Sequence, residues 1–448
     1  MLFAKYVFQT ILFRAASIVI GLFSGIITAR SVGVEGVGIL ALLFLIPDLA
    51  FRFGNMGFGS AFAYYIAKNK ISARKALQLI WFVGSLGSVI SILAILTIWQ
   101  QDFSPWKDIQ PNLFFLYLVT IPLLFYNNFL QRLLVGLFKI TESNIFGVIT
   151  NYCHFALLLI LVVGLKLDVL GVTLAVLSRD LIGLCYLYWR TRKHCHKEVA
   201  NCNYVKEELT LSSLWNYGKW NYLIMFSNFF INELPLILLN KLSAGTVSIG
   251  LFSKARDLGN QTNIIVESIT TVLFPFAASS NEKDGTHLTN KLCRNFLFFI
   301  SFIIIFVLIL IKPIIGFLYG SDFVPAAEVF YVMAPAFISW PIGRFLGIHV
   351  AAIGFPKSVF FTGCCAFVIV LPISWFLISE LGATGAGLGA SIMFVTWSIL
   401  RLFLYIRVTK TNVVQVLIPQ KEDFTDYLIF IYLIAKKIKN LNHHPEAK

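Results

Sequence analysis

The chain has 448 residues, of which 58% are hydrophobic and only 13% are charged, and its formal net charge is +14. Soluble domains carry roughly 25% charged residues, so this composition excludes an ordinary soluble protein and indicates one that lies mostly in a bilayer. Nucleic-acid binding is excluded too, because the basic residues form no clustered face on a soluble module.

Apolar segments long enough to cross a bilayer recur along the chain. A membrane-spanning helix needs roughly 20 mostly apolar residues. No small-residue cleavage site follows the first such segment, so it is predicted to be a retained span and not a signal peptide. Twelve spans are predicted, at residues 8–30, 36–67, 77–100, 112–138, 145–165, 168–189, 214–240, 249–279, 290–318, 325–352, 357–380 and 382–408.

Lysine and arginine are distributed unequally between the predicted loops. With the N-terminus in the cytoplasm, the cytoplasmic loops hold most of them, for example at 68–75 and 190–206, whereas the opposite loops carry mainly acidic residues. By the positive-inside rule, both termini are expected to be cytoplasmic. Most of the net positive charge is therefore a signal of membrane topology.

Two glycine-containing stretches reveal an internal repeat. "RSVGVEGVGIL" (30–40) matches "LSAGTVSIGLF" (242–252), so that Gly38 corresponds to Gly250, a shift of 212 residues. Two later loop and helix starts match in the same order. The predicted fold is therefore all-α integral membrane, with twelve transmembrane helices in two parallel six-helix repeats. Such repeats are related by an axis along the membrane normal, as in one class of transporter.

The repeat sets the expected domain boundaries. They are an N-terminal six-helix bundle at 1–189, a cytoplasmic basic linker at 190–213, a C-terminal six-helix bundle at 214–408 and a cytoplasmic tail at 409–448. Within the tail, "DYLIFIYLIAKKIKN" (426–440) is too short to span. Because its apolar run is followed by lysines, we expect an interfacial helix on anionic lipid.

The second span contains "LIPDLAFRFGN" (45–55), which places charges inside an apolar helix. A charge at the centre of a membrane helix costs about 2.5–3.5 kcal/mol. Asp48 and Arg52 are four residues apart and can pair on one helix face. Pro47 removes a backbone hydrogen bond, so a kink is expected there.

Other spans carry polar residues at steps of three and four, which places them on one helix face. Such stripes must face protein or water, and we expect them to line a cleft between the halves. The alternative is that they only hold helices together. The predicted cationic cavity residues are Arg14, Arg52, Arg256 and Arg344. The predicted polar lining or ion-coupling residues are Asp48, Asn55, Asn228, Asn232, Glu233, Asn260, Asn263 and Glu267. Guanidinium groups bind phosphate oxygens bidentately, so a phosphate or pyrophosphate ligand is indicated.

The stretch "GVEGVGILALLFLIPDLAFRFGNMGFGSAFAYYIAKNK" (33–70) resembles the second helix of polysaccharide-unit flippases. These O-antigen-type translocases belong to the superfamily of multidrug and oligosaccharidyl-lipid exporters. The resemblance implies a V-shaped pair of bundles with a central cavity in the bacterial inner membrane. It also implies export of an undecaprenyl-pyrophosphate-linked oligosaccharide to the outer leaflet. In related lipid flippases, cavity arginines lie on the first, second and eighth helices, which here carry Arg14, Arg52 and Arg256.

The resemblance implies no cofactor. The expected partners are the lipid-linked oligosaccharide, membrane lipid, a proton or sodium ion for coupling, and the polysaccharide polymerase machinery. No phosphate-binding glycine-rich loop is present, so no nucleotide is expected to power transport directly.

Two alternatives stay open. A multidrug and toxin extrusion antiporter would have the same fold, but it needs cavity carboxylates and few cations, which the arginine excess disfavours. A membrane polysaccharide polymerase or ligase would need a large outer loop with catalytic groups. The predicted outer loops are short and show no such constellation, so an enzyme is not expected.

Overall fold

The computed structural model describes residues 2–67, 71–101, 105–107, 109–198, 211–242, 245–279, 282–420 and 422–423. Over these residues the chain is helical and has no β-strand. Nine stretches among them are long and apolar enough to cross a membrane. The expected all-α membrane fold is confirmed, while the count of twelve spans stays a prediction.

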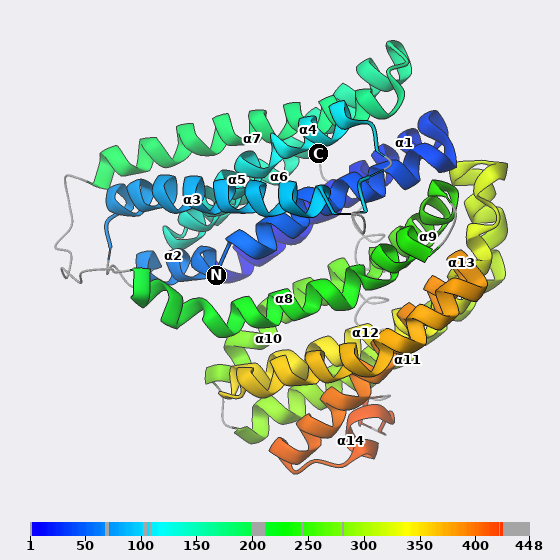
Figure 1. Cartoon of the computed structure of the whole chain (residues 1–448). Coiled ribbons are helices and arrows are strands. Elements are labelled where there is room, and N and C mark those ends of the chain that lie inside the picture. Colours follow the sequence, from blue (N-terminus) through cyan, green and yellow to red (C-terminus); the bar gives the residue numbers. More distant parts are fainter. Residues whose placement is uncertain are drawn as a thin grey trace, which may run out of the picture.

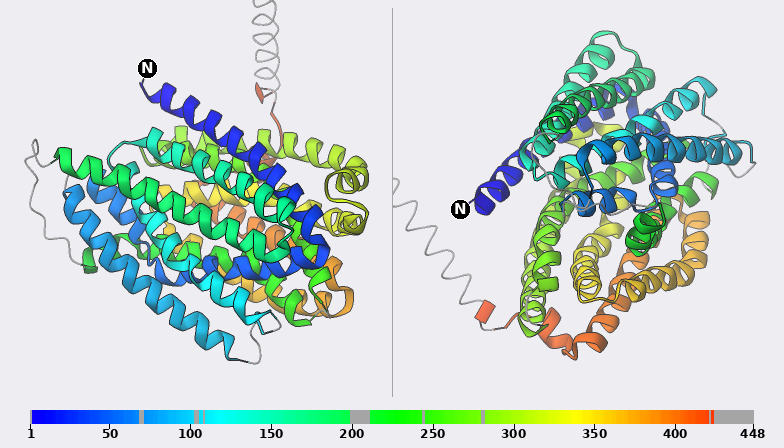
Figure 2. Two further views of the ribbon diagram at one scale, coloured as in Figure 1. Left: turned by 90° about the horizontal axis from the view of Figure 1, so that it is seen from above. Right: turned by 90° about the vertical axis from the view of Figure 1, so that its left-hand side faces the viewer.

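The helices lie alongside one another, with the first half of the chain above and the second half below (Figure 1). Figure 2 (right) looks along the helices and separates the two halves by colour. The first half contains α1 (Leu2–Gly54), α2 (Phe58–Ala67), α3 (Ala73–Trp99), α4 (Pro111–Leu118), α5 (Thr120–Gly136), α6 (Ile140–Leu158), the π-helical turn η1 (Leu159–Gly164) and α7 (Asp168–Glu198). The second half contains α8 (Leu211–Leu242), α9 (Thr246–Gly259), the 3-10 turn η2 (Asn260–Thr262), α10 (Asn263–Ser279), α11 (Glu282–Tyr319), the 3-10 turn η3 (Ser321–Phe323), α12 (Ala326–Ala352), α13 (Pro356–Thr409) and α14 (Val413–Leu417).

Two long helices each join two predicted spans through a glycine with non-helical torsions. Gly33 in α1 has φ of 69°, and Gly382 in α13 has φ of 56°. Glycine adopts this region without the steric cost that a Cβ brings. As a result, α1 contains the first predicted span and the second as far as Gly54, and α13 contains the last two predicted spans.

The second predicted span is interrupted at a different place from the one expected. The backbone stays helical through Pro47, and the chain turns at Asn55–Gly57, where Met56 has φ of 45° and Gly57 has φ of 76°. The eighth predicted span is also interrupted, because η2 separates α9 from α10. These two helices have 14 and 17 residues, so neither is long enough to cross a membrane alone.

Apolar side chains pack inside each half and also cover its outer surface. Phe125 and Phe129 of α5 are fully buried in the first half. On α11, Ile309 and Phe317 are 72% and 78% exposed. A contiguous exposed apolar face of this kind is expected only for a helix whose surroundings are lipid.

The halves touch at a contact between α1 and α9 that follows the internal repeat. A Cβ placed on Gly38 would lie 1.9 Å from the backbone oxygen of Thr246, and one placed on Gly250 would lie 2.1 Å from that of Val34. Thr246 is Val34 shifted by 212 residues, the same shift that relates Gly250 to Gly38. The contact is therefore reciprocal, and each side requires glycine for backbone to meet backbone.

The predicted linker and the predicted tail are described only in part. Helix α7 continues to Glu198, so the predicted linker begins inside it, and residues 199–210 lie outside the described part. The start of the tail packs on α11, where Arg294 donates to the Asp423 carboxylate at 2.8 Å. The predicted interfacial helix at 426–440 also lies outside the described residues.

Candidate functional site

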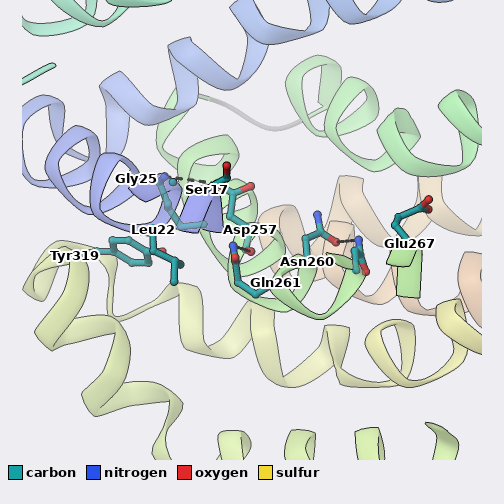
Figure 3. Close-up of a pocket in the computed structure, with 11 residues that line it drawn as sticks. Ser17, Leu22, Gly25, Asp257, Asn260, Gln261, Glu267 and Tyr319 are labelled. Carbon is teal, nitrogen blue, oxygen red and sulfur yellow. Dashed lines mark hydrogen bonds and ion pairs between the residues drawn. The ribbon is translucent and has the colours of Figure 1, made fainter. Parts of the chain in front are cut away.

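A cavity of about 720 Å³ lies between the two halves and opens to the surface (Figure 3). One wall is the early part of α1, where Gly21 and Gly25 leave open space: a Cβ at either position would meet no atom within 4 Å. The facing wall is α9, η2 and α10. The lining consists of Ser17, Gly21, Leu22, Gly25, Lys254, Asp257, Asn260, Gln261, Asn263, Glu267 and Tyr319.

The break in the eighth predicted span brings amide side chains to this wall. At η2 the Asn263 side-chain nitrogen donates to Asn260 Oδ1 at 3.0 Å, and Gln261 donates to the Asp257 backbone oxygen at 2.9 Å. A 3-10 turn winds more tightly than an α-helix and so changes the direction in which successive side chains point. Asn260, Gln261 and Asn263 therefore line one cavity wall. Figure 3 shows the first two of them between Asp257 and Glu267.

The predicted cavity arginines are each paired with a carboxylate wherever their side chains are described. Arg256 Nη1 of α9 donates to Glu233 Oε2 of α8 at 2.8 Å, and both side chains are mostly buried. Arg344 Nη2 of α12 lies 3.1 Å from Glu267 Oε1 of α10, and Glu267 itself lines the cavity. These pairs connect different helices, and each carboxylate lowers the cost of placing an arginine away from water.

The Asp48–Arg52 pair is present as predicted, with Arg52 Nε 3.2 Å from Asp48 Oδ1. It does not line the large cavity. Arg52 Nη1 also donates to the Met225 backbone oxygen of α8 at 3.3 Å, and Asn55 Nδ2 lies 3.9 Å from Met225 Sδ. These polar groups therefore hold α1 of the first half against α8 of the second half.

The remaining predicted site residues are Arg14, Asn228 and Asn232. The side chain of Arg14 lies outside the described part of the structure. Asn228 accepts a hydrogen bond on its backbone oxygen from Asn232 Nδ2 at 2.6 Å. Asn232 in turn lines a second, smaller pocket together with Glu233 and Arg256.

Lys254, Gln261 and Tyr319 also line the cavity, and sequence reasoning did not select them. Lys254 Nζ is 3.5 Å from Asp257 Oδ2 and 5.4 Å from the centre of the Tyr319 ring. The spacing of Lys254 and Asp257, three residues apart on one helix face, was a usable signal. Tyr319 had no such signal, because an aromatic residue near the end of a membrane helix is common at the lipid–water interface.

A family model described as "Polysaccharide biosynthesis protein" matches residues 3–280, which is more than half of the chain. No curated protein matches the chain by sequence.

Solved structures are similar over nearly the whole length. An inward-facing multidrug resistance MATE family transporter of the MOP superfamily has a TM-score of 0.70 and 12% identity, covering 88% of this chain and 94% of its own. The lipid II flippase MurJ, in an inward closed conformation, has a TM-score of 0.66 and 16% identity, covering 97% of this chain and 100% of its own. An outward-facing MATE transporter has a TM-score of 0.64 and 14% identity, covering 91% and 95%. The chain therefore has the fold of these transporters.

Proposed function

The chain belongs to the polysaccharide biosynthesis protein family, and we propose that it is a flippase for an undecaprenyl-pyrophosphate-linked oligosaccharide. It moves one repeat unit of a surface polysaccharide, such as O-antigen, from the cytoplasmic to the outer leaflet by alternating access. The observation that carries this proposal is the cavity between the halves. Its wall carries amides and carboxylates inside an otherwise apolar molecule. Arg344 pairs with the lining residue Glu267, and Arg256 pairs with Glu233 in the adjoining smaller pocket.

The arginine–carboxylate pairs suit a pyrophosphate that enters and leaves. A guanidinium forms bidentate hydrogen bonds with phosphate oxygens as readily as with a carboxylate. Without substrate, Glu233 forms an ion pair with Arg256, and Glu267 forms one with Arg344. A bound pyrophosphate displaces them, and no arginine is left buried without a counter-charge at either stage. This exchange keeps binding weak enough for release.

The same carboxylates provide a means of ion coupling. A proton or sodium ion that binds Asp48, Glu233 or Glu267 neutralises the carboxylate and frees its arginine for the substrate. Loss of that ion returns the carboxylate to the arginine and expels the anion. A ligand shifts such an equilibrium only by its differential affinity for the two states, and here the arginine pairs supply that difference.

The location of the cavity suits a lipid-linked substrate. On one side the halves are joined through Arg52 and Met225, and Tyr222 donates to the Phe53 backbone oxygen at 3.4 Å. On the other side the early part of α1, from Ser17 to Gly25, faces Lys254–Glu267 across the cavity. The polyprenyl chain stays in the bilayer on that open side while the pyrophosphate and sugars occupy the cavity.

The orientation follows from the charge distribution of the loops. In the bacterial inner membrane, with both termini cytoplasmic, the Gly38–Thr246 and Gly250–Val34 contacts lie toward the outer face. In this orientation the two contacts bring the halves together at the outer face, and we propose that the substrate enters from the cytoplasmic leaflet, where it is made.

Deletion of the gene tests the function directly. We expect undecaprenyl-linked units to accumulate on the cytoplasmic leaflet while the surface polymer disappears. The wild-type gene should restore the polymer. The double variant Arg52→Ala/Arg256→Ala should not, although it should reach the membrane in equal amount. Unchanged lipid-linked pools in the deletion strain would refute the proposal.

A multidrug cation exporter is the second candidate, because one observation favours it. Among the side chains that the structure describes, two carboxylates, Asp257 and Glu267, line the large cavity, whereas Lys254 is the one cation that does so. A cavity of that charge also suits an organic cation. The same deletion strain distinguishes the two, because a cation exporter predicts new sensitivity to cationic drugs with intact surface polysaccharide.

A further inference from the structure

A second pocket of about 120 Å³ adjoins the large cavity in the second half of the chain. It lies among α8, α9, α12 and α13, and it shares the wall residues Asp257, Asn260 and Asn263 with the large cavity. A molecule in the large cavity can therefore extend one group into this pocket.

The floor of the pocket is apolar and closely packed. Met333 and Ala336 of α12 are 2% and 1% exposed, and Phe337 lies beside them. A Cβ on Gly259 would lie 2.0 Å from the Phe337 ring, so this glycine lets α9 approach the ring directly. The floor is thus held in place by two helices in close contact and is preorganised for a ligand.

The rim combines aromatic rings with polar groups. Trp340 of α12 and Phe394 of α13 are half-buried and present part of their rings to the pocket. The Arg256–Glu233 pair, at 2.8 Å, and the Asn232 amide face the same space. One side therefore offers flat apolar surface, and the other offers hydrogen-bond donors and acceptors.

This combination matches the chemistry of a sugar ring. A pyranose has a face of C–H groups that packs on an aromatic ring, whose face carries partial negative charge. Its edge carries hydroxyl or acetamido groups that hydrogen-bond to amides and carboxylates. A lipid tail would leave the polar groups unpaired, which is costly. Drug-sized ligands occupy pockets of roughly 300–1,000 Å³, larger than this one.

We propose that this pocket is the subsite for the sugar residue next to the pyrophosphate, with Trp340 and Phe394 as the stacking rings. The proposal rests on the flippase function and sets the register of the substrate. Arg256 binds the pyrophosphate, and Glu233, once displaced, accepts a hydrogen bond from the first sugar. The remaining sugars extend into the large cavity. The first sugar is thus the part of the glycan that the protein recognises.

Equilibrium binding to the full-length protein in lipid nanodiscs tests the subsite. The probes are farnesyl pyrophosphate and four farnesyl-pyrophosphate-linked monosaccharides, which carry glucose, galactose, N-acetylglucosamine or N-acetylgalactosamine. We expect at least one glycosylated probe to bind the wild type tenfold more tightly than farnesyl pyrophosphate. In Trp340→Ala and Phe394→Ala this ratio should fall to about one, while the affinity for farnesyl pyrophosphate changes less than twofold.

Two further variants keep the test informative. Trp340→Phe retains a ring and should keep most of the sugar advantage, even if the alanine variant folds poorly. Trp375→Ala removes a tryptophan from α13 that is 45% exposed and outside the pocket, and it should behave as wild type.

The outcomes separate the subsite from the function. If the wild type binds farnesyl pyrophosphate but gains nothing from any of the four sugars, the subsite is overturned and the flippase proposal stands. If the sugar advantage survives in both alanine variants, the sugar binds elsewhere and the subsite is again overturned. If no probe binds, both proposals are overturned.

Discussion

Two regions of this molecule lie where the halves face each other, and they are built on opposite principles. At the α1–α9 contact, glycines bring backbone against backbone, and each side is the repeat equivalent of the other. Around the cavity, charged side chains meet, and the repeat is not preserved. The position equivalent to Arg256 is Phe44, and the position equivalent to Asp257 is Leu45, each at the same shift of 212 residues.

The difference shows that the two halves share the shape of their backbone contact but not the charged residues around the cavity. A reciprocal backbone contact depends on shape, and a single added methyl group on either side destroys it. Charge pairs depend on which residues face each other, so one half can acquire them while the other keeps apolar residues. We therefore expect the symmetric contact to act as a hinge or seal and the asymmetric cavity to determine chemical selectivity.

The largest expected effect comes from closing the space at the symmetric contact. Gly250→Val places a branched side chain where even a Cβ would lie 2.1 Å from the Val34 backbone oxygen. The helices must separate, so the outward-closed state is lost, and we expect export of surface polysaccharide to fall at least tenfold. Maleimide labelling of a cysteine at Val34 should rise in the same variant, which reports opening at this contact.

A glycine at an open position is the matched control. Gly147→Ala in α6 introduces a Cβ that meets nothing within 4 Å and lies outside both pockets, so export should change less than twofold. If Gly250→Val exported normally, the contact would not be needed for transport, and its symmetry would be a relic of gene duplication alone.

The second expected effect concerns the asymmetric region. Arg256→Ala leaves Glu233 without its partner and removes a phosphate-binding group, so export should fall roughly tenfold while the protein stays in the membrane. Arg256→Lys keeps the charge but loses the bidentate geometry, so it should restore only part of the activity. Transport assays in reconstituted vesicles, with equal amounts of each variant, measure both. Full activity of Arg256→Ala would exclude it from the substrate path.

A gain in affinity is the third expectation. Asp48→Asn removes the carboxylate that pairs with Arg52 at 3.2 Å, while an amide of similar size keeps the packing. Arg52 is then more available to an anion, so binding of farnesyl pyrophosphate should tighten several-fold and turnover should slow. Titration of this probe against wild type and variant checks the first effect. Unchanged affinity would show that Arg52 only holds α1 to α8.

Much of this architecture was predictable from the sequence, because its signals are local or periodic. Hydropathy predicted the helices, and the match of Gly38 with Gly250 predicted the repeat. Spacing of four residues predicted the Asp48–Arg52 pair. The partners of Arg256 and Arg344 were not predictable, since Glu233 and Glu267 come from other helices and their pairing depends on tertiary packing. Aromatic pocket residues such as Trp340 were missed because aromatic residues are common throughout apolar membrane helices. Sequence alone does not distinguish a ring that binds a ligand from one that packs against lipid or protein.

The smallest expected effect lies away from both regions, where the tail is attached to α11. Arg294 is 2% exposed, and it donates to Asp423 at 2.8 Å, to Glu422 at 2.9 Å and to the Gln415 backbone oxygen at 2.8 Å. Burial alone would raise the pKa of Asp423, but hydrogen bonds from Arg294 and from the Gln420 backbone N–H lower that pKa below its ordinary value.

A lowered carboxylate pKa means that the attachment is strongest when Asp423 is ionised. Its contribution is fully present above the ordinary aspartate pKa of 3.8 and is lost as the pH falls through the lower pKa of the folded state. At neutral pH Asp423→Asn should therefore release the tail, and trypsin should cleave it several-fold faster than in the wild type. Glu422→Gln should have a weaker effect, because Glu422 is 48% exposed whereas Asp423 is fully buried. Export should change less than twofold in both variants, since neither residue touches the cavity or the α1–α9 contact. A large loss of export in Asp423→Asn would instead show that tail attachment is coupled to movement of the two halves.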